Sequence, residues 1–335
     1  MKVTIRDVAK VAGVSVSTVS KVLNGHYSIS EKTILHVQEV MKELDYHPNA
    51  NAQNFATGSN KTIVLLADMS PNMAFRNPHM FEIIAGFEET IQRKGYRLIL
   101  QSADETAACS YAEDIISRHS ADGIAIHVGV MSHPLAAILT RSNFPHIVLG
   151  MPDFECQVCW IDNNNIYSGT VAANFLLSEG YKRIAYIGGK KYDLGSTHRL
   201  QGVKQGLETA GYCLEDQFIW LGESTRADSY RMTKKLLEQN DKPDAIICSN
   251  NYIALGSVDA IHEKGLHIPK DIGVMTFDDY PFSQIIEPQL TVVDIKVRDM
   301  GSQAGKFLVD IIKHPNMQVQ TYITISSVIK RESTR

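Results

Sequence analysis

Apolar positions near the start of the chain recur at the three- and four-residue spacing of amphipathic helices. A first short helix is expected after Thr4, which together with Asp7 resembles a helix cap, and Gly13 ends it. A second helix is expected to begin at Ser15 and a third to span about residues 30–45. The predicted inward-facing positions are Ile5, Val8, Ala9, Ala12, Val19, Val22, Leu23, Ile34, Val37, Met41 and Leu44. Three helices in so short a segment predict a very small core.

From Thr62 onward the pattern changes to short apolar runs that alternate with amphipathic segments. The runs TIVLLAD, YRLILQS and DGIAIHV are typical of strands, and helices are expected over about 79–94 and 107–119. The rhythm continues through IAYIGG, AIICSN and IGVMTF. This alternation predicts parallel sheets with helices on both faces, and about ten strands divide more readily into two sheets than one. The expected fold is an all-α headpiece followed by an α/β module of two doubly wound parallel-sheet subdomains.

The first two predicted helices have the arrangement of a helix-turn-helix, in which the second helix enters the DNA major groove. Generic three-helix packing would produce the same apolar pattern. The outward face of the second helix, however, carries small hydroxyl side chains and one cation, Lys21, without a bulky acid. Such a face suits close approach to phosphates and base edges, which favours DNA binding.

Composition describes an ordinary globular protein of two or three domains. The 335 residues are 44% hydrophobic and 21% charged, and the formal net charge is only -4. A nucleic-acid partner would therefore have to bind a local surface, because the whole molecule does not attract polyanions. The N-terminus lacks the apolar core of a secretory signal, and no run of 18 apolar residues occurs. A cytoplasmic protein that does not enter a membrane is expected.

Neither a metal site nor a cofactor site is predicted. The five cysteines are an odd number spread over a long chain, which fits reduced thiols. Cys156 and Cys159 form a CxxC, but no second CxxC or close His pair supplies the other ligands of a structural zinc. No glycine follows the strand TIVLLAD as a dinucleotide motif requires, and no Walker A, GxSxG or HExxH sequence occurs. An enzyme therefore has no specific motif in its favour.

Ligands of open parallel sheets bind at the carboxyl ends of the strands. Polar side chains that directly follow apolar runs are therefore candidates for a ligand site. Four residues satisfy this condition: Asp68, Asp162, Asn250 and Asp278.

The N-terminal segments TIRDVAKVAGVSVSTVSKVLNG and ISEKTILHVQEVMKELDYHPNA resemble the headpiece of the LacI/GalR family of bacterial transcriptional repressors. The resemblance implies that Val16, Ser17 and Lys21 read bases. It also implies phosphate contacts from Ser15, Thr18, Ser20 and Asn24. The family most often carries Arg where Lys21 stands, and a Lys is a point donor rather than a bidentate fork, so the resemblance does not imply a base preference at that position.

The rest of the chain resembles the same family's effector module, whose fold is that of the type I periplasmic sugar-binding proteins. Matching stretches include NPHMFEIIAGFEE, WIDNNNIYSGTVAANFLLSEGYKRIAYIGG, PDAIICSNNYIALG and IPKDIGVMTFDDYPFSQIIEPQLTVV. The resemblance implies that Arg199, Asn250 and Asp278 contact the ligand, as donors and acceptors for the hydroxyls of a sugar. As alternatives, Arg199 could pair with an acid across the cleft, and Asp278 could cap the following turn.

Three departures from the family concern the wall on which a ligand would stack. His79 and Met80 stand where two aromatics are usual, with Phe81 one place later, and Ser224 replaces another aromatic. A longer loop brings Phe75 and Arg76, which could restore the wall. Additional effector-site candidates are His79, Phe81, Trp160 and Asp162, although Trp160 could instead pack between subdomains. An unusual or larger carbohydrate is expected as ligand.

The segment NANAQNFATG, at residues 49–58, joins the two modules. A run of eight or so small and amide residues is too short to form a stable helix in isolation. Its one large apolar residue, Phe55, has no neighbouring apolar residues with which to form a core. In the family this hinge becomes helical when two copies pair on DNA, and an apolar side chain wedges into the minor groove. The resemblance implies this role for Phe55, with Ala52 and Gln53 beside it. Ordinary packing of Phe55 is the alternative.

The sequence thus predicts a dimeric, ligand-responsive repressor that binds a near-palindromic DNA operator. Its headpiece is expected at 1–48, the hinge and linker at 49–61, and the effector domain at 62–335. Within that domain the first subdomain is expected at about 62–160 and 293–320, and the second at about 161–292 and 321–330. A dimer is expected because the final RESTR follows no leucine heptads that would hold a tetramer. The alternatives are a solute-binding protein and a sugar-processing enzyme of the same fold.

Overall fold

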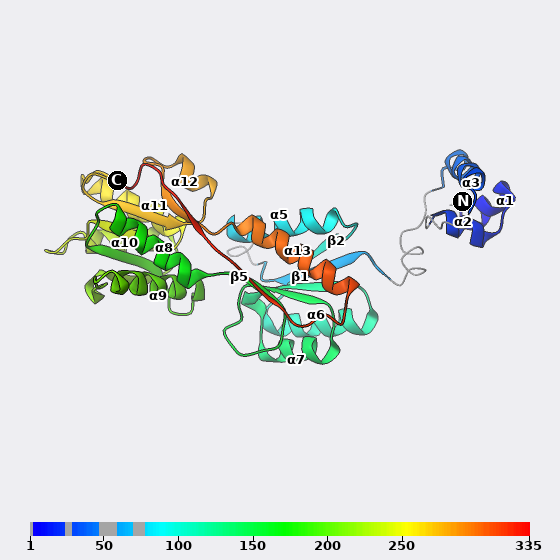
Figure 1. Ribbon diagram of the computed structural model, residues 1–335, viewed down its shortest axis with the longest axis horizontal. Coiled ribbons are helices and arrows are strands. Elements are labelled where there is room, and N and C mark those ends of the chain that lie inside the picture. The colour runs from blue at the N-terminus through cyan, green and yellow to red at the C-terminus, as the bar shows by residue number, and fades with distance from the viewer. Residues whose placement is uncertain (1–2, 24–28, 47–58, 70–77) are drawn as a thin grey trace. The chain divides into compact units, whose positions relative to one another are not determined.

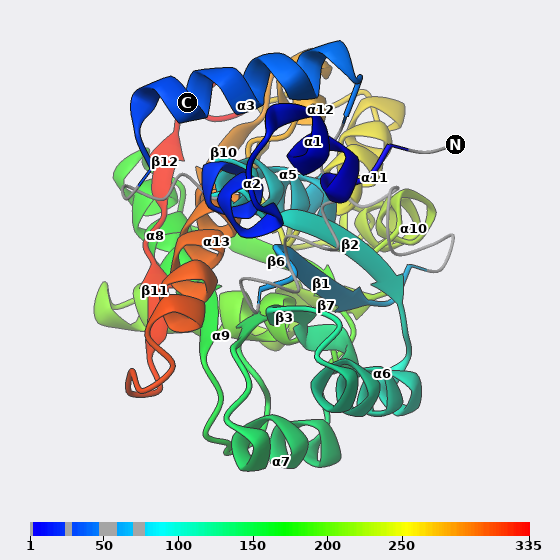
Figure 2. The same ribbon diagram turned by 90° about the vertical axis from the view of Figure 1, so that its right-hand side faces the viewer.

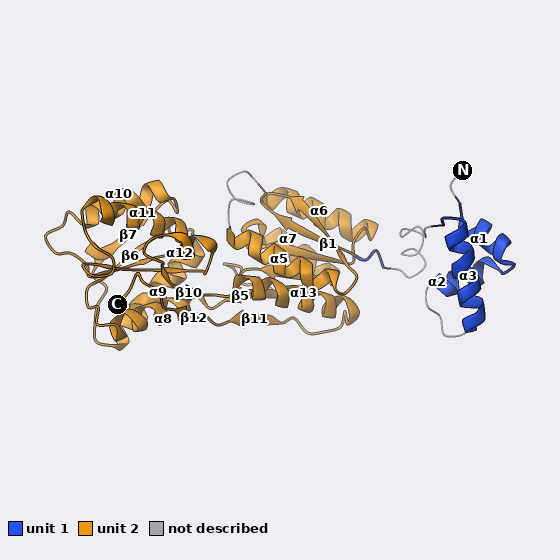
Figure 3. Cartoon of the chain, turned by 90° about the horizontal axis from the view of Figure 1, so that it is seen from above, with its two compact units in different colours: residues 1–61 blue, residues 62–335 orange. Residues whose placement is uncertain are grey.

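A computed structural model describes residues 3–23, 29–46, 59–69 and 78–335. The chain divides into two compact units, residues 1–61 and residues 62–335, which Figure 3 colours separately. Among the described residues, no helix combines the length and apolar character needed to cross a membrane. All five cysteines lie within the described residues and are free thiols.

The first unit contains the three helices that the sequence predicts. They are α1 (Ile5–Ala12), α2 (Val16–Leu23) and α3 (Glu31–Glu43). The Asp7 carboxylate accepts hydrogen bonds from the Thr4 amide (2.9 Å) and hydroxyl (2.7 Å), and Gly13 ends α1 with a φ of 67°. The core is formed by Val8, Ala9, Ala12, Val19, Val22, Val37 and Val40. Val40 belongs to this core although the sequence did not predict it. Ile34, Met41 and Leu44 were predicted as core positions but are only partly buried at its edge.

The second unit contains two six-stranded sheets, one in each subdomain. The strands are β1 (Thr62–Ala67), β2 (Arg97–Ser102), β3 (Gly123–His127), β4 (His146–Leu149), β5 (Trp160–Asn163), β6 (Ile184–Gly189), β7 (Ile219–Gly222), β8 (Ala245–Cys248), β9 (Gly273–Phe277), β10 (Thr291–Asp294), β11 (Thr321–Thr324) and β12 (Ser327–Ile329). The first sheet has the order β11-β5-β4-β3-β1-β2 and the second β12-β10-β9-β8-β6-β7. All neighbouring strands are parallel except β10 and β12, which confirms the predicted fold class.

Helices cover both faces of each sheet, as the alternating pattern predicts. On the first sheet, α5 (Pro78–Gln92) and α13 (Val297–Lys313) pack on one face, and α6 (Glu105–Arg118) and α7 (His133–Ser142) pack on the other (Figure 2). On the second, α8 (Asn165–Ser178) and α9 (Leu194–Thr209) lie opposite α10 (Arg226–Leu236) and α11 (Asn251–Glu263) (Figure 3). The short elements are η1 (Val128–Val130), η2 (Asp216–Phe218) and α12 (Pro281–Ile285).

The strand pairing corrects the predicted subdomain boundaries by a few residues. Residues 161–163 and 321–324 belong to the first sheet, because β5 and β11 pair with each other along their length. Residues 293 and 294 belong to the second sheet, because β10 pairs with β9. The chain therefore crosses between the subdomains near residues 164, 295 and 325, and these crossings are visible in Figure 1.

Two glycines allow α8 and α9 to approach closely. A Cβ on Gly169 would lie 2.0 Å from the Arg199 carbonyl oxygen, and a Cβ on Gly202 would lie 1.8 Å from the Ile166 carbonyl oxygen. Since both contacts involve backbone, no side-chain rotation could relieve them. This close crossing places Asn165, at the start of α8, beside Arg199 of α9.

Candidate functional site

The outward face of α2 carries the hydroxyls and the cation that the sequence singles out. The Ser15 hydroxyl accepts from the Thr18 amide (3.1 Å) and hydrogen-bonds the Ser17 (2.7 Å) and Thr18 (2.8 Å) hydroxyls. Ser15 thereby caps the helix and joins the three side chains into one network. Because each hydroxyl can both donate and accept, the network can reorganise around a phosphate oxygen or a base edge.

Other residues predicted to contact DNA are also accessible on α2. Val16 is 42% exposed, Lys21 is exposed, and Ser20 is half-buried. Their neighbours Val19 and Val22 are buried in the core, so α2 presents one face to the unit and another to solvent. Asn24 lies outside the described residues, as do the hinge positions Ala52, Gln53 and Phe55.

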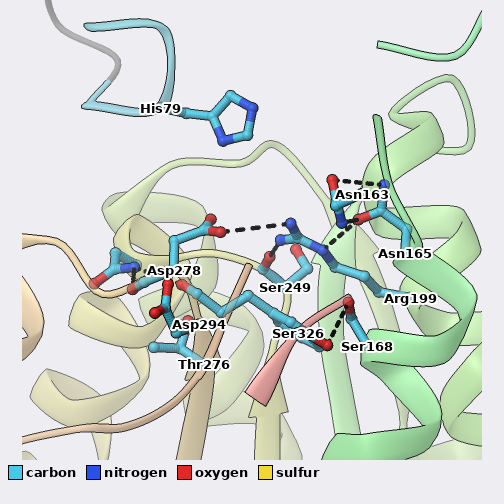
Figure 4. Close-up of polar contacts among 12 residues, drawn as sticks. His79, Asn163, Asn165, Ser168, Arg199, Ser249, Thr276, Asp278, Asp294 and Ser326 are labelled. Atoms are coloured by element: carbon cyan, nitrogen blue, oxygen red, sulfur yellow. Dashed lines mark hydrogen bonds and ion pairs between the residues drawn. The ribbon is translucent and has the colours of Figure 1, made fainter. Parts of the chain in front are cut away.

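Arg199 is the centre of a buried polar cluster in the second subdomain. Its Nε donates to Asn165 Oδ1 (2.9 Å) and its Nη1 donates to the Ser249 carbonyl oxygen (2.6 Å). Its Nη2 lies 3.7 Å from Asp278 Oδ1. Figure 4 shows Arg199 between Asp278 on one side and Asn165 on the other. The guanidinium also lies over the Phe277 ring, 4.5 Å from its centroid. We call Arg199, Asn165, Ser249, Asn251 and Asp278 the Arg199 cluster.

Asp278 directly follows β9, at the carboxyl end of a central strand. Its φ of 70° is in the left-handed region, and its amide donates to the Val293 carbonyl oxygen (2.9 Å). Burial raises the pKa of the Asp278 carboxyl, and Arg199 opposes this rise. Its carboxylate pairs with Arg199 of the same subdomain, rather than with a group across the subdomain boundary.

The two asparagines after β8 have different partners. Asn250, the predicted ligand residue, caps α11, because its Oδ1 accepts from the Ile253 amide (3.0 Å). The buried Asn251 donates from Nδ2 to the carbonyl oxygens of Phe277 (2.7 Å) and Asp278 (2.9 Å). Asn251 therefore holds the backbone of the Asp278 turn in place.

The first subdomain contributes two imidazoles, His79 and His127. His79, on α5, forms a 3.1 Å hydrogen bond through Nδ1 with the Tyr280 hydroxyl of the second subdomain. Burial, reinforced by Arg199, lowers the pKa of His79 to about 4. Burial and the neighbouring His79 likewise lower the pKa of His127 to about 4. Both rings are therefore neutral at pH 7, so each presents one donor and one acceptor.

Asp162 lies at the carboxyl end of β5, close to the crossing between subdomains. Its carboxylate accepts from the amides of Met151 (3.1 Å) and Asn163 (2.7 Å). Burial raises the pKa of Asp162, while these two amides and the charge of Arg199 oppose the rise. The next residue, Asn163, donates from Nδ2 to Asn165 Oδ1 (2.9 Å), which links this strand end to the Arg199 cluster.

No hydrogen bond or ion pair among the described residues joins Phe81 or Trp160 to this cluster. Phe81 is 53% exposed on α5. Trp160 lies at the amino end of β5 and packs against the core on one face of the first sheet. Ser224, which stands where the family has an aromatic residue, donates its hydroxyl to Asp193 Oδ2 (3.2 Å). Phe75 and Arg76 lie outside the described residues.

The residues that sequence reasoning missed mostly adjoin those it found. Asn251 follows Asn250, and Ser249 precedes it. His127 ends β3, so the condition that selected Asp278 would also have selected it. Asn165 begins α8, and only the crossing of α8 over α9 brings it to Arg199. No local signal in the sequence indicates that contact.

Three consecutive residues after β9 connect different parts of the second unit. Asp278 faces Arg199, while Asp279 pairs with Arg331 near the C-terminus at 2.7 Å. Tyr280, although it belongs to the second subdomain, is buried in the core cluster of the first. We call Asp278–Tyr280 the connecting segment.

Two cavities lie outside the Arg199 cluster. One of about 330 Å³ adjoins the connecting segment and is lined by Glu82, Asp279, Tyr280, Asp294, Lys296, Val297, Arg298 and Asp299. Another of about 560 Å³ lies around Ile285 and Pro288 and contains none of the predicted site residues. Among the described residues, no group of three or more His, Cys, Asp or Glu could hold a metal ion.

Comparison with protein families gives two matches within the chain. The family of bacterial regulatory proteins of the lacI type matches residues 4–49, and the periplasmic binding protein-like domain matches residues 173–334. The first match covers α1 to α3, and the second covers most of the second subdomain and the C-terminal elements. The two matches agree with the predicted headpiece and effector module.

Individual relatives match over nearly the whole length. The HTH-type transcriptional repressor PurR of Histophilus somni (strain 129Pt) is 28% identical over 334 residues, covering 99% of each chain. The transcriptional regulator CelR in complex with cellobiose is 25% identical with a TM-score of 0.73, covering 99% of this chain and 100% of that one. The lac repressor dimer bound to operator and the anti-inducer ONPF has a TM-score of 0.85 at 23% identity, covering 100% and 99%, and shows the fold. Relatives named as repressors also bear out the prediction of a regulator rather than an enzyme.

Proposed function

Because the chain belongs to the lacI family of bacterial regulatory proteins, we propose that it is a sequence-specific DNA-binding repressor controlled by a small-molecule effector. The observation that carries this proposal is the presence of two sites in one chain. The exposed hydroxyl network and Lys21 of α2 suit DNA, and the buried Arg199 cluster suits a polar ligand.

In this proposal Val16, Ser17 and Lys21 contact base edges in the major groove. Ser15, Thr18, Ser20 and Asn24 contact phosphates. Two observations support this assignment of residues to bases and to phosphates. Val16 and Lys21 are exposed, and Ser15 belongs to a network of hydroxyls. An exposed methyl-bearing side chain can pack against thymine, and hydroxyls and lysine can donate to phosphate or to guanine.

We propose that the protein acts as a homodimer in the cytoplasm. One headpiece reaches few base pairs, so two half-sites of a near-palindromic operator are needed for affinity and specificity. The first sheet ends at β2, where Ile99 is 49% and Leu100 is 40% exposed. This apolar edge supports a contact with a second copy. Sedimentation of the wild type against an Ile99→Lys variant tests it, and a wild type that stays monomeric at micromolar concentration contradicts it.

For the effector, we propose a carbohydrate that contacts Asp278 and Asp162 at the strand ends, Arg199 of α9 and His79 of α5. A sugar hydroxyl both donates and accepts, and so matches carboxylates and neutral imidazoles together. The complex of the similar CelR with cellobiose supports a sugar. A thermal-shift screen of sugars, sugar phosphates and nucleosides identifies the compound class, since a ligand that binds the native state raises the melting temperature.

Binding to genomic DNA fragments at rising salt tests the proposed function directly. We expect one or a few fragments to be retained with a steep salt dependence. Lys21→Ala should weaken binding and reduce the salt slope by about one, as expected for loss of one cationic contact. The matched control is Lys42→Ala, which removes an exposed lysine from α3 and should leave binding unchanged. Failure to retain any specific fragment excludes a DNA-binding regulator, and catalytic turnover of a screened ligand would favour an enzyme.

A further inference from the structure

Strand β11 forms one edge of the first sheet, and β2 forms the other. On its inner side β11 pairs with β5, from Thr321 opposite Trp160 to Thr324 opposite Asn163. Within the described part of the chain, no strand pairs with its outer side. Figure 2 shows β11 at the margin of the sheet, beside α13. An unpaired edge presents backbone N–H and C=O groups to which a further strand can bind.

The register identifies which backbone groups of β11 point outward. The Thr324 carbonyl oxygen accepts from the Asn164 amide (3.0 Å), so Thr324 directs its backbone groups towards β5. In a parallel pair this direction alternates along the strand. Tyr322 therefore also faces β5, whereas the backbone groups of Thr321 and Ile323 face away from it. Each of these two residues offers one donor and one acceptor at the outer side of the strand.

Large apolar side chains are exposed along the same segment. They are Met317 (37% exposed), Val319 (53%), Tyr322 (38%), Ile323 (51%) and Ile325 (69%). Tyr322 lies on the face of the sheet that α13 covers, where its ring centroid is 6.2 Å from that of Phe307. Ile323 points to the opposite face, because successive side chains of a strand alternate. Exposed apolar side chains gathered in one place mark an interaction surface. We call residues 317–325 the β11 edge.

The β11 edge lacks the charged residues that usually protect an edge strand. The chain carries no Asp, Glu, Lys or Arg between Lys313 and Lys330. The other three edge strands have a charge within them or directly after them. β2 contains Arg97, β7 is followed by Glu223, and β12 is followed by Lys330. Of the four edges, β11 is therefore the least protected against pairing with another strand.

We propose that the β11 edge pairs with the β11 edge of a second copy of this chain, as two antiparallel strands related by a twofold axis at Tyr322. In this arrangement Thr321 of each copy lies opposite Ile323 of the other, and each such pair exchanges two backbone hydrogen bonds. The strand is thus complementary to itself, as a symmetric contact requires.

The absence of charge favours a second copy over a partner of different sequence. Two copies bring identical side chains together, so any charge on β11 would face its own kind and destabilise the pair. A different partner is selected largely by opposite charge, which the β11 edge does not offer.

This contact is separate from the homodimer contact proposed at Ile99 and Leu100. Because β2 and β11 are opposite edges of one six-stranded sheet, the two contacts do not overlap and can form in the same assembly. An assembly that uses both edges contains more than two copies. The β11 contact involves neither α2 nor the Arg199 cluster, so it goes beyond the proposed binding of DNA and effector.

Sedimentation of the full chain over a range of concentrations tests the proposal with Ile323→Lys. The substitution should leave the fold intact, since the side chain is exposed and the backbone amide faces away from β5. It brings two lysines close together across the twofold axis. We expect the largest assembly of this variant to have about half the mass of the largest wild-type assembly. Should Ile323→Lys not fold, Ile325→Lys, directly after β11, takes its place.

Leu221→Lys is the matched control. Leu221 is 40% exposed on β7, the edge strand of the second sheet, so the variant adds the same charge to a different edge. It should sediment as the wild type does. Equal masses for the wild type and Ile323→Lys would leave the β11 edge to a partner of another kind and overturn the proposal. Ile99→Lys tests the homodimer contact separately, so the failure of one contact is distinguishable from the failure of the other.

Hydrogen exchange provides a second measurement, which reports on the backbone rather than on the mass. Pairing of the two strands should slow exchange of the Thr321 and Ile323 amides as the protein concentration rises. The Thr321 amide of Ile323→Lys should lose this dependence. Exchange rates that are the same at low and high concentration in the wild type overturn the proposed strand pairing.

Discussion

Replacement of Gly202 by alanine should force α8 and α9 apart. The added Cβ would lie 1.8 Å from the Ile166 carbonyl oxygen, 2.7 Å from its carbon and 2.9 Å from the Thr170 amide nitrogen. Real Cβ atoms essentially never approach closer than 3.0 Å, so the backbones must separate by at least 1.2 Å, the difference between 3.0 and 1.8 Å. The Arg199 Nε to Asn165 Oδ1 bond, 2.9 Å long, bridges the same two helices and would be broken by this separation.

The expected loss of stability combines these two effects. Overpacking of a close contact costs about 1–3 kcal/mol, and loss of a hydrogen bond to a charged group costs about 1.5–3 kcal/mol. Partial relaxation of the helices makes the two effects less than additive, so we expect a total of about 3 kcal/mol. For a domain of this size each kcal/mol lowers the melting temperature by about 2–4 °C, which gives a decrease of about 6–12 °C. Effector affinity should decrease as well, because Arg199 loses the bond that orients it.

Calorimetry of the full chain is the assay, and Gly195→Ala is the matched control on the same helix. A Cβ on Gly195 would meet only Asp193 Oδ1, at an ordinary 3.6 Å. Alanine is favoured over glycine in a helix, so this variant should melt at or slightly above the wild-type temperature. If Gly202→Ala melts within about 2 °C of Gly195→Ala, the crossing does not depend on glycine and the reasoning from backbone clash is refuted.

Three further predictions concern the hinge, the buried imidazoles and the connecting segment. Phe55→Ala, in a segment outside the described residues, should weaken operator binding at least about tenfold while ligand affinity stays constant, since unstacking a base step involves a few kcal/mol; equal operator affinity in a gel-shift assay would return Phe55 to ordinary packing. Burial holds the pKa of His79 and His127 at about 4, below the ordinary 6.5, so the unfolded chain binds more protons between these values. Stability of the effector domain should therefore decrease as the pH falls from about 6.5 to 4, and His127→Asn should make melting curves less pH-dependent; an unchanged slope contradicts the assignment. Tyr280→Phe removes the 3.1 Å bond to His79 and should cost about 0.5–1.5 kcal/mol in denaturant unfolding, whereas no loss relative to the wild type would show that the bond does not stabilise the domain.

The headpiece was predictable from sequence because its signals are local. Thr4 and Asp7 form the cap that their spacing predicts, and Gly13 ends α1 in the left-handed conformation. Likewise, each apolar run and each amphipathic segment is recognisable from its own residues. Their alternation therefore predicted the two-sheet architecture correctly. Each of these features depends on residues a few positions apart.

The subdomain boundaries and the full Arg199 cluster were not predictable in the same way. Whether β5 and β11 belong to the first sheet depends on their pairing with each other across about 160 positions, which the composition of neither strand reveals. Similarly, the rule that polar residues follow strands identified Asp278 and Asn250. It did not predict that Asn250 caps α11 or that Asn251 bonds the Asp278 carbonyl oxygen. Helix crossing angles and turn geometry decide these contacts.

The connecting segment has a mechanical consequence for the effector domain. Two residues of extended chain span at most about 7 Å, so the Cα atoms of Asp278 and Tyr280 cannot lie farther apart than this. The ring is buried in the core of the first subdomain, and the carboxylate lies at Arg199 in the second. Asp279 is anchored from the side by Arg331. A shift of the Asp278 backbone is therefore expected to move the Tyr280 ring as well, so a ligand that contacted the Arg199 cluster would affect the packing of both subdomains.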